Sequence, residues 1–217
     1  MGEILAEAID AGRVFGEGDS RVVAVQHATC RIEPSDRIAL VGPSGSGKST
    51  LLHLLADLDS PTSGVVRWPA LGDPTKLRPS RISFVFQSES LLAPLTVLEN
   101  IEVPRLLAGG DADEARRDAL EILDALDLSA LADKLPEEIS GGQAQRAAVA
   151  RSLVTQPDLI LADEPTGQLD HAAATQLLNL LERRLQGTTI ALVIATHDLA
   201  VAGRMKTQWT MHHGVLQ

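Results

Sequence analysis

The sequence predicts an α/β fold with a mostly parallel β-sheet. Short apolar runs at residues 159–162 and 189–196 have the pattern of buried strands, and a helical pattern over residues 171–185 separates them. Strands and helices that alternate in this way favour a parallel sheet covered on both faces. With 217 residues, of which 44% are hydrophobic, the chain has enough core for one large domain over residues 1–217.

The N-terminal part begins with strand-like segments separated by Gly, Asp and Pro turns. Over the first 40 residues this predicts a small N-terminal antiparallel β subdomain that leads into a core strand at 37–42. Leucines at helical spacing predict a helix over 48–58, which the turn-forming segment 60–64 ends. Residues 81–87 are a further strand candidate.

The middle of the chain has a different character. Pro94, Pro104 and the pair of glycines at 109–110 interrupt a leucine-rich helical stretch. Asp111 and Glu114 predict a capping box for the helix that follows. We therefore expect a helical subdomain over about 88–140, inserted into the α/β core.

Charge and composition limit the classes of partner. A net charge of −10 argues against nucleic-acid binding, which needs a basic face, and against attachment to anionic lipid by charge alone. The single cysteine, Cys30, excludes an internal disulfide and favours a reducing compartment. The start of the chain lacks the pattern of a secretory signal, and the apolar runs are too short to span a bilayer, so we expect a soluble protein.

Residues 42–50 read GPSGSGKST, the pattern G-x-x-x-x-G-K-[ST], between a predicted strand and a predicted helix. This predicts a phosphate-loop NTPase core, in which backbone N–H groups and the helix N-terminus surround a phosphate. A merely flexible Gly/Ser loop is the alternative, and the flanking elements disfavour it. Lys48 is expected to reach the β- and γ-phosphates, and the Ser49 hydroxyl to bind Mg²⁺. The predicted nucleotide-binding residues are Gly42, Ser44, Gly45, Ser46, Gly47, Lys48, Ser49 and Thr50.

Two carboxylates, Asp163 and Glu164, follow the apolar strand at 159–162. Beside a phosphate loop, Asp163 is expected to hold Mg²⁺ through its water shell, and Glu164 is the candidate general base for the attacking water. The alternative is a strand-to-turn boundary whose acids only face solvent. The phosphate loop favours the catalytic interpretation.

A predicted helix opens on Ser140-Gly141-Gly142, although glycine in a helix costs about 1 kcal/mol relative to alanine. Ser140 and Gln143 predict a capping box, and the two glycines would leave the first N–H groups uncovered by side chains. Such a helix start suits an anion. A tight packing contact at the helix start is the alternative explanation.

Together these segments resemble an ABC-type ATPase. GPSGSGKST, Gln87, ISGGQAQR, LILADEP, GQLD and THD occur in the order and approximate spacing of that family, over essentially the whole chain. The resemblance implies ATP and Mg²⁺ as ligands and a second copy of the chain as partner. In that dimer, the γ-phosphate of ATP held by one copy would be capped by the other copy's Ser140, Gly141, Gly142 and Gln143.

The resemblance also assigns single residues outside these loops. Gln87 resembles the Q-loop glutamine, which contacts Mg²⁺ and the attacking water, and Asp170 resembles the D-loop aspartate, which communicates across the dimer. His197 resembles the switch histidine at the γ-phosphate. Catalysis would then depend on Glu164, His197 and Gln87, and the metal on Ser49, Gln87 and Asp163.

The adenine contact is less clearly marked, because the family often uses a tyrosine and this chain has none. Phe15 is the candidate for stacking on the base, and a core position in the small sheet is the alternative. Three positions depart from the family's usual residues: Gln168 in the D-loop, Asp57 in place of glycine, and Ser35-Asp36 in place of Gly-Glu. Asp57 is expected to alter a local turn.

LLHLLADLDSPTSG, LLAPLTVLENIEVP and LADEPTGQLD are similar to the subgroup that serves macrolide export and lipoprotein release. This implies a separate integral-membrane permease as partner, and a location in the cytoplasm on the inner face of the cell membrane. Docking of the permease is expected over about 88–104. Two alternatives are open for the apolar side chains of this segment: they form a groove for a partner helix, or they are simply part of the subdomain core. These side chains are Leu91, Leu92, Leu95 and Val97.

Two other functions fit an ABC-type ATPase. The chain could regulate a membrane division or signalling complex without moving a substrate. An ATPase acting on DNA or the ribosome is disfavoured, because the chain has no long coiled-coil insertion and no second ATPase domain, and its charge is acidic.

Overall fold

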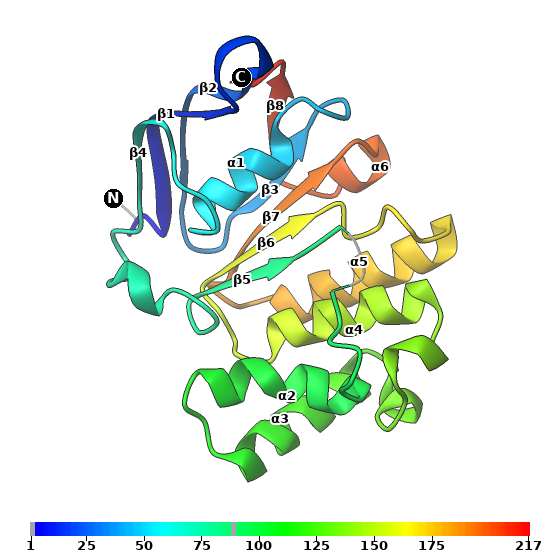
Figure 1. Cartoon of the computed structure of the whole chain (residues 1–217). Helices are drawn as coiled ribbons and strands as arrows, with labels where there is room; N and C mark the ends of the chain where they lie inside the picture. Colours follow the sequence, from blue (N-terminus) through cyan, green and yellow to red (C-terminus); the bar gives the residue numbers. More distant parts are fainter. Residues whose placement is uncertain (1–2, 88–89) are drawn as a thin grey trace.

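The computed structural model describes residues 3–87 and 90–217. Nine strands form one sheet in the order β4-β1-β2-β9-β8-β3-β7-β6-β5 (Figure 1). Their bounds are β1 Ala6–Phe15, β2 Val22–Ile32, β3 Arg37–Val41, β4 Ser63–Arg67, β5 Ile82–Val85, β6 Leu159–Asp163, β7 Ala191–Thr196, β8 Thr207–His212 and β9 Val215–Leu216. The helices are α1 Lys48–Leu55, α2 Val97–Leu107, α3 Ala112–Ala125, α4 Gly141–Leu153, α5 His171–Leu185 and α6 Leu199–Ala202, with short 3₁₀ turns between some of them.

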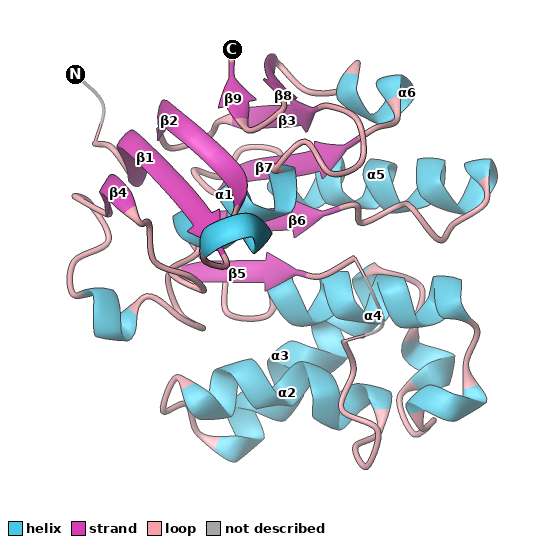
Figure 2. Cartoon of the chain, turned by 45° about the horizontal axis from the view of Figure 1, so that its top comes forward, coloured by secondary structure: helices cyan, strands magenta, loops and turns pink. Residues whose placement is uncertain are grey.

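The sheet has a parallel part and an antiparallel part, which confirms the predicted fold class. Strands β8, β3, β7, β6 and β5 pair in parallel, whereas β1 pairs antiparallel with both β2 and β4. Side chains of the parallel strands alternate between two cores. Leu192 and Ile194 pack on the side of α4 and α5, and Val193 and Ala195 pack on the side of α1 (Figure 2).

The sequence analysis missed β4, β8, β9 and α6. β8 is half exposed and β4 has no buried residue, so neither contains the apolar run that identified the core strands. β9 and α6 span only two and four residues. Short elements without a buried stripe leave little periodicity to detect.

The helical stretch from α2 to α3 agrees with the sequence in part. The prediction that Pro104 breaks the helix is wrong, because Pro104 lies inside α2, which continues to Leu107. Burial of Val97 and Ile101 in the core offsets the hydrogen bond that proline lacks. Asp111 does cap α3, but the described hydrogen bonds include none from the Asp111 N–H to the Glu114 carboxylate. The subdomain boundary at 88–140 stays a prediction.

Helix α1 ends earlier than predicted, at Leu55, because Asp57 adopts a left-handed conformation with φ 55°. The Asp57 N–H donates to the Leu54 carbonyl (3.2 Å) and the Leu58 N–H donates to the His53 carbonyl (2.9 Å). This is the Schellman arrangement, in which glycine is usual at the left-handed position. The expected alteration of the turn by Asp57 is not seen, since the residue adopts the conformation that glycine favours.

We therefore expect Asp57→Gly to raise the free energy of unfolding by about 0.5 to 1 kcal/mol, because it removes the Cβ strain of the left-handed conformation. Asp57→Ala is the matched control and should bring no gain, since it keeps the Cβ. Urea unfolding measures both variants. A less stable Asp57→Gly variant would contradict this explanation.

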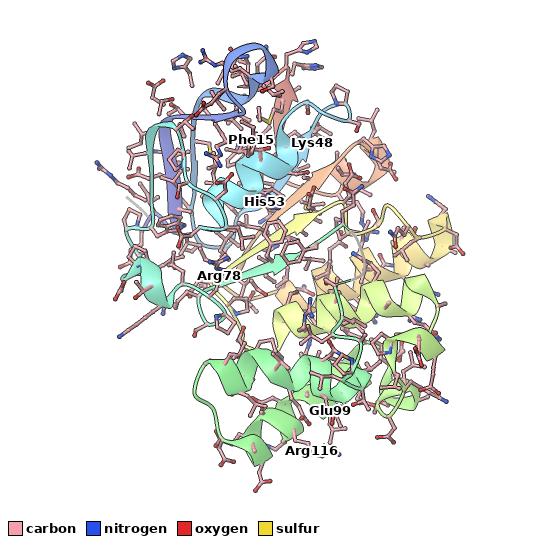
Figure 3. The ribbon with its side chains drawn as sticks, in the orientation of Figure 1. Phe15, Lys48, His53, Arg78, Glu99 and Arg116 are labelled. Carbon is pink, nitrogen blue, oxygen red and sulfur yellow. The ribbon has the colours of Figure 1, made fainter. Side chains whose placement is uncertain are left out.

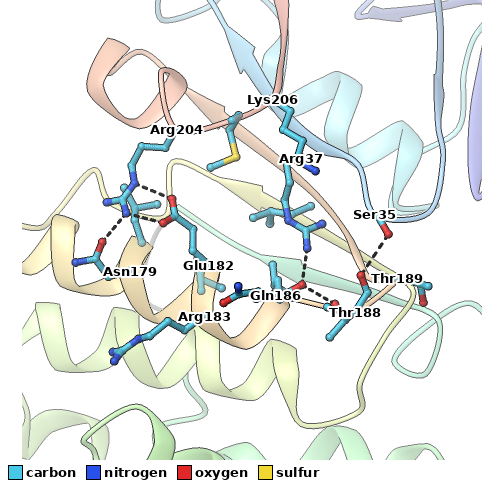
Figure 4. Close-up of a pocket in the computed structure, with 16 residues that line it drawn as sticks. Ser35, Arg37, Asn179, Glu182, Arg183, Gln186, Thr188, Thr189, Arg204 and Lys206 are labelled. Atoms are coloured by element: carbon cyan, nitrogen blue, oxygen red, sulfur yellow. Dashed lines mark hydrogen bonds and ion pairs between the residues drawn. The ribbon is translucent and has the colours of Figure 1, made fainter.

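Arg37, the first residue of β3, binds the carboxyl end of α5, which ends at Leu185 (Figure 4). Its guanidinium donates to the carbonyl oxygens of Leu185 (2.8 Å), Ile190 (2.6 Å) and Asp36 (2.9 Å). Burial lowers the pKa of this guanidinium, and the charge of Asp36 opposes that effect. The side chain lies in the wall of a cavity of about 990 Å³.

Replacing Arg37 by methionine should lower the free energy of unfolding by about 2 to 3 kcal/mol, because three carbonyl oxygens lose a charged donor. Arg183→Met on the same cavity wall is the control. Arg183 is exposed, so its loss should change stability by less than about 0.5 kcal/mol. Similar losses for the two variants in thermal unfolding would disprove the role of Arg37.

Candidate functional site

The predicted phosphate loop lies between β3 and α1, as the pattern requires. Its turns are fixed by neighbouring backbone: the Gly214 N–H donates to the Ser46 carbonyl at 2.9 Å. Gly47 has φ 103°, and a Cβ there would overlap the Ala24 carbonyl oxygen of β2. The glycine is therefore required by both conformation and space.

Lys48 is almost fully buried, with 6% of its surface exposed. Its ammonium donates to the carbonyl oxygens of Gly42 (2.8 Å) and Pro43 (3.0 Å), so the side chain folds back over its own loop. Ser46 is also buried, and its hydroxyl has no hydrogen-bond partner within the described structure. These buried polar groups leave hydrogen-bonding capacity for a ligand in the loop.

The carboxyl ends of β3, β7 and β6 bring the predicted catalytic segments together. Asp163, the last residue of β6, pairs with Ala195 of β7, and β7 pairs with β3. Asp163 is 5% exposed, and its Oδ1 atom has no hydrogen-bond partner among the described residues. Burial raises the pKa of this carboxyl, while the Ser49 hydroxyl and the His53 ring lower it. A buried carboxylate with a free oxygen beside a serine hydroxyl suits a hard divalent cation.

Glu164 and His197 form a hydrogen-bonded pair. Glu164 Oε1 lies 2.9 Å from His197 Nδ1, and the Glu164 N–H donates to the Ala195 carbonyl at 2.9 Å. Glu164 has φ 48°, a conformation that is uncommon for a residue with a side chain. Its side chain is 10% exposed, whereas that of His197 is 68% exposed. The pair thus consists of a sheltered carboxylate and an open imidazole.

The Ser-Gly-Gly segment begins α4 as predicted. The Ser140 Oγ accepts from the Gln143 N–H at 3.3 Å, and the Gln143 side chain accepts from the Ser140 N–H at 2.8 Å. A Cβ at Gly142 would lie 3.2 Å from a methyl group of Leu169, so the packing contact considered as the alternative exists at this glycine. Leu169 is a flexible side chain, and the contact alone does not require glycine.

A hollow of about 240 Å³ joins this helix start to the segment before α5; Ser140, Gly142, Gln143, Leu169 and Asp170 are among its lining residues. Asp170 is the N-cap of α5, where its carboxylate accepts from the Ala173 N–H at 2.7 Å. The Ser-Gly-Gly segment and the D-loop segment are therefore neighbours. In Figures 1 and 2 the starts of α4 and α5 and the carboxyl ends of β6 and β7 lie on the same side of the molecule.

Gln87 lies two residues beyond the end of β5 and is exposed. Two buried or half-buried side chains of α4 hold the chain near it. Gln145 donates to the Phe86 carbonyl (3.5 Å), and Arg151 donates to the carbonyl and the hydroxyl of Ser90, each at 2.7 Å. The sequence analysis missed both contacts. The first part of the predicted docking segment, residues 88–89, lies outside the described residues.

Of the apolar residues proposed for docking, some belong to the subdomain core and at least one is exposed as a docking groove would require. Val97 is fully buried and Leu91 packs on the same core, whereas Leu92 is 47% exposed. The loop from 92 to 96 is held by Asn100, whose amide nitrogen donates to three backbone carbonyl oxygens and whose amide oxygen accepts from the Leu92 N–H. This loop is thus a rigid surface with an apolar tip. Nothing in the sequence pattern marked Asn100.

Phe15 ends β1 and is 42% exposed, so the alternative that it is a core residue is wrong. Its partner across the hairpin is Val22, two residues before the Ala24 that contacts Gly47. Figure 3 shows Phe15 and Lys48 in the same region around α1. An exposed ring on the strand pair that contacts the phosphate loop is available for stacking.

Two kinds of feature were not found among the described residues. Residues 3–87 and 90–217 contain no group of three or more His, Cys, Asp or Glu side chains that could hold a metal. Across the same residues, no helix is long and apolar enough to cross a membrane.

Comparisons with known proteins agree with this geometry. Residues 25–167 match the model of the ABC transporter family. The lipoprotein-releasing system ATP-binding protein LolD of Legionella pneumophila (strain Paris) is 40% identical over 223 residues, covering 100% of this chain and 98% of that protein. The same-named protein of Xanthomonas campestris pv. campestris (strain 8004) is 40% identical, with 100% and 94% covered.

A solved structure is also closely similar. The ATP-binding cassette MJ0796, in a dimeric post-hydrolysis state bound to ADP and Pi, superimposes with a TM-score of 0.89 at 33% identity, covering 98% of this chain and 96% of that one. These findings confirm the resemblance inferred from the sequence. The chain belongs to the ABC transporter family, as an ATP-binding subunit that hydrolyses ATP.

Proposed function

We propose that this chain powers a separate membrane permease by closing head-to-tail with a second copy over two ATP molecules. The observation that supports this most directly is the placement of two incomplete half-sites on one side of the molecule. The phosphate loop with Asp163 and Glu164 forms one half, and the capped start of α4 with Asp170 forms the other. When two copies face each other, the phosphate-loop half of one copy would meet the α4-start half of the other. Each ATP would then touch both chains.

In the proposed reaction, Glu164 accepts a proton from the water that attacks the γ-phosphorus. The carboxylate is sheltered, and its bond to His197 fixes one oxygen, which leaves the other free to bind water. The exposed ring of His197 would contact the γ-phosphate while it keeps that bond. Lys48 would exchange its two carbonyl partners for phosphate oxygens, which are stronger acceptors.

Magnesium fits the residues present. The free Asp163 oxygen and the Ser49 hydroxyl would hold it, with Gln87 as a third ligand brought in by the Q-loop. When bound, the ion neutralises charge that develops on the phosphate oxygens. Burial raises the pKa of the Asp163 carboxyl, and the charges of His53 and Lys48 only partly oppose that effect, so a bound cation would further favour the ionised carboxylate.

The permease would dock on the segment around 90–104, where Leu92 is exposed on a loop held by Asn100. A chain docked in this way would lie in the cytoplasm, on the inner face of the cell membrane. LolD is named for lipoprotein release, and the 25%-identical cbiO1 of Clostridium perfringens, which superimposes with a TM-score of 0.84, is described as part of the ABC transporter complex cbiONQ. We extend to this chain the role of a motor subunit, with lipoproteins as the candidate cargo class.

Complementation between two inactive variants tests the shared site. Lys48→Ala removes the phosphate contact of one copy, and Gly141→Asp places a carboxylate where the other copy would meet the γ-phosphate. Each variant alone should be inactive, but a mixture should regain ATPase activity, because the mixed dimer contains one intact composite site. A mixture that forms dimers yet stays inactive would favour sites contained within one chain.

A further inference from the structure

Arg13 covers one face of the exposed Phe15 ring. Its guanidinium carbon lies 4.6 Å from the ring centroid, a cation–π distance. Phe15 is 42% exposed, whereas the Arg13 side chain is only 23% exposed. The ring therefore has one face backed by a cation and keeps open surface on the rest.

Arg13 is itself held in place by Asp59. The arginine Nε and Nη2 atoms each lie 2.8 Å from a different carboxylate oxygen of Asp59. A bidentate pair of this kind fixes the plane of the guanidinium as well as its position. The cation behind Phe15 is therefore oriented before any ligand arrives.

Asp59 in turn lies in the segment after α1 and is bonded to the end of that helix. Its N–H donates to the His53 carbonyl at 3.3 Å, and its carboxylate also accepts from the Ser60 N–H at 2.8 Å. Thr62 joins the same segment to β1, since its hydroxyl donates to the Gly12 carbonyl (3.1 Å) and accepts from the Val14 N–H (3.2 Å). The helix that begins in the phosphate loop thus fixes, at its other end, the strand that presents Phe15.

An exposed phenylalanine on a strand end would otherwise be free to change rotamer. A flat base that stacks on a mobile ring must immobilise it, which costs affinity, whereas a ring fixed beforehand avoids that cost. We propose that Arg13 is a positioning residue for the nucleotide base: held by Asp59, it fixes Phe15 with one open face for adenine. This inference rests on the proposed function, because it requires that Phe15 stacks on the base of ATP.

The test separates the contribution of the base to ATP affinity from that of the phosphates. Isothermal titration calorimetry in EDTA, which prevents turnover, gives the dissociation constants of ATP and of inorganic tripolyphosphate for the full chain. The dissociation constant of tripolyphosphate divided by that of ATP measures what the nucleoside adds to the affinity of the triphosphate. Arg13→Met should lower this ratio by about 3- to 10-fold and leave tripolyphosphate binding unchanged.

Three further variants control the result. Asp59→Asn keeps the guanidinium but loosens it, and Arg13→Lys keeps the charge without the fork, so both should lower the ratio by less than Arg13→Met does. Arg31→Met removes an exposed arginine from the far end of the same strand pair and should change nothing. Arg13→Lys also keeps the test valid if Arg13→Met fails to fold.

Two outcomes would overturn the inference. If Arg13→Met weakens ATP and tripolyphosphate by the same factor, Arg13 acts on the phosphates or on the fold and not on the base. If Phe15→Ala collapses the ratio while the Arg13 variants leave it unchanged, the ring stacks without help from Arg13. A Phe15→Ala variant with an unchanged ratio would instead disprove adenine stacking itself, which separates that failure from the failure of the Arg13 role.

Discussion

Glu164→Gln should lower the ATPase rate by at least about 100-fold, because a general base contributes about 10² to 10⁴ in rate. The amide keeps the shape of the side chain and a hydrogen bond to His197, but it cannot take a proton from water. ATP should therefore remain bound, and size-exclusion chromatography should show a shift from monomer to dimer only with Mg-ATP.

The same experiment contains its controls. Adding Gly141→Asp to Glu164→Gln should abolish the dimer, since the new carboxylate would face the γ-phosphate of the other copy. Glu137→Gln removes an exposed carboxylate just before α4 and should leave the rate unchanged. An ATPase rate within a few-fold of the original in Glu164→Gln would show that another group is the base. An ATP-bound variant that remains monomeric would contradict ATP-driven closure of the isolated chain.

The second large effect concerns the fold of the phosphate loop. Gly47→Ala should lower the free energy of unfolding by about 3 to 5 kcal/mol, because it combines a left-handed backbone with overpacking. The new Cβ would overlap the Ala24 carbonyl oxygen and lie 2.9 Å from the Met211 methyl group, at φ 103°. The measurement is thermal unfolding, in which the melting temperature should fall by about 6 to 20 °C.

Gly45→Ala is the matched variant for this prediction. Gly45 also has a positive φ, 74°, but no heavy atom lies within 4 Å of its Cβ position. Only the backbone cost of about 1 to 2 kcal/mol should appear. Equal shifts for the two variants would show that the contact with β2 does not constrain Gly47.

The sequence was most informative where a segment has a local pattern, either an apolar run or polar residues at a fixed spacing. The buried strands β3, β6 and β7, the span of α5 and the cap of α4 by Ser140 and Gln143 agree with prediction, because each has a local pattern. Phosphate-loop geometry follows from a motif with a defined conformation. The bond between Glu164 and His197 joins two segments that the sequence analysis had marked separately, at the ends of the neighbouring strands β6 and β7.

What the sequence did not show depends on contacts between distant positions. Arg13 with Asp59, Arg37 with Leu185, and Arg151 with Ser90 join residues far apart in the chain, and no periodicity marks them. Pro104 was misjudged for a related reason. Intrinsic propensity opposes a helix there, but tertiary burial of the other face of α2 decides the outcome.

Helix α4 would have a mechanical role in the proposed dimer. It is attached to the segment around Gln87 at two points, through Gln145 and Arg151, while its free end is the Ser-Gly-Gly start. From Arg151 to Gly141 the helix spans about 15 Å. In the proposed dimer, a stiff helix of this length would convert a tilt at the loop proposed to dock on the permease into a displacement at the other subunit's nucleotide. Each copy would then respond to its own permease contact and act on its neighbour's ATP.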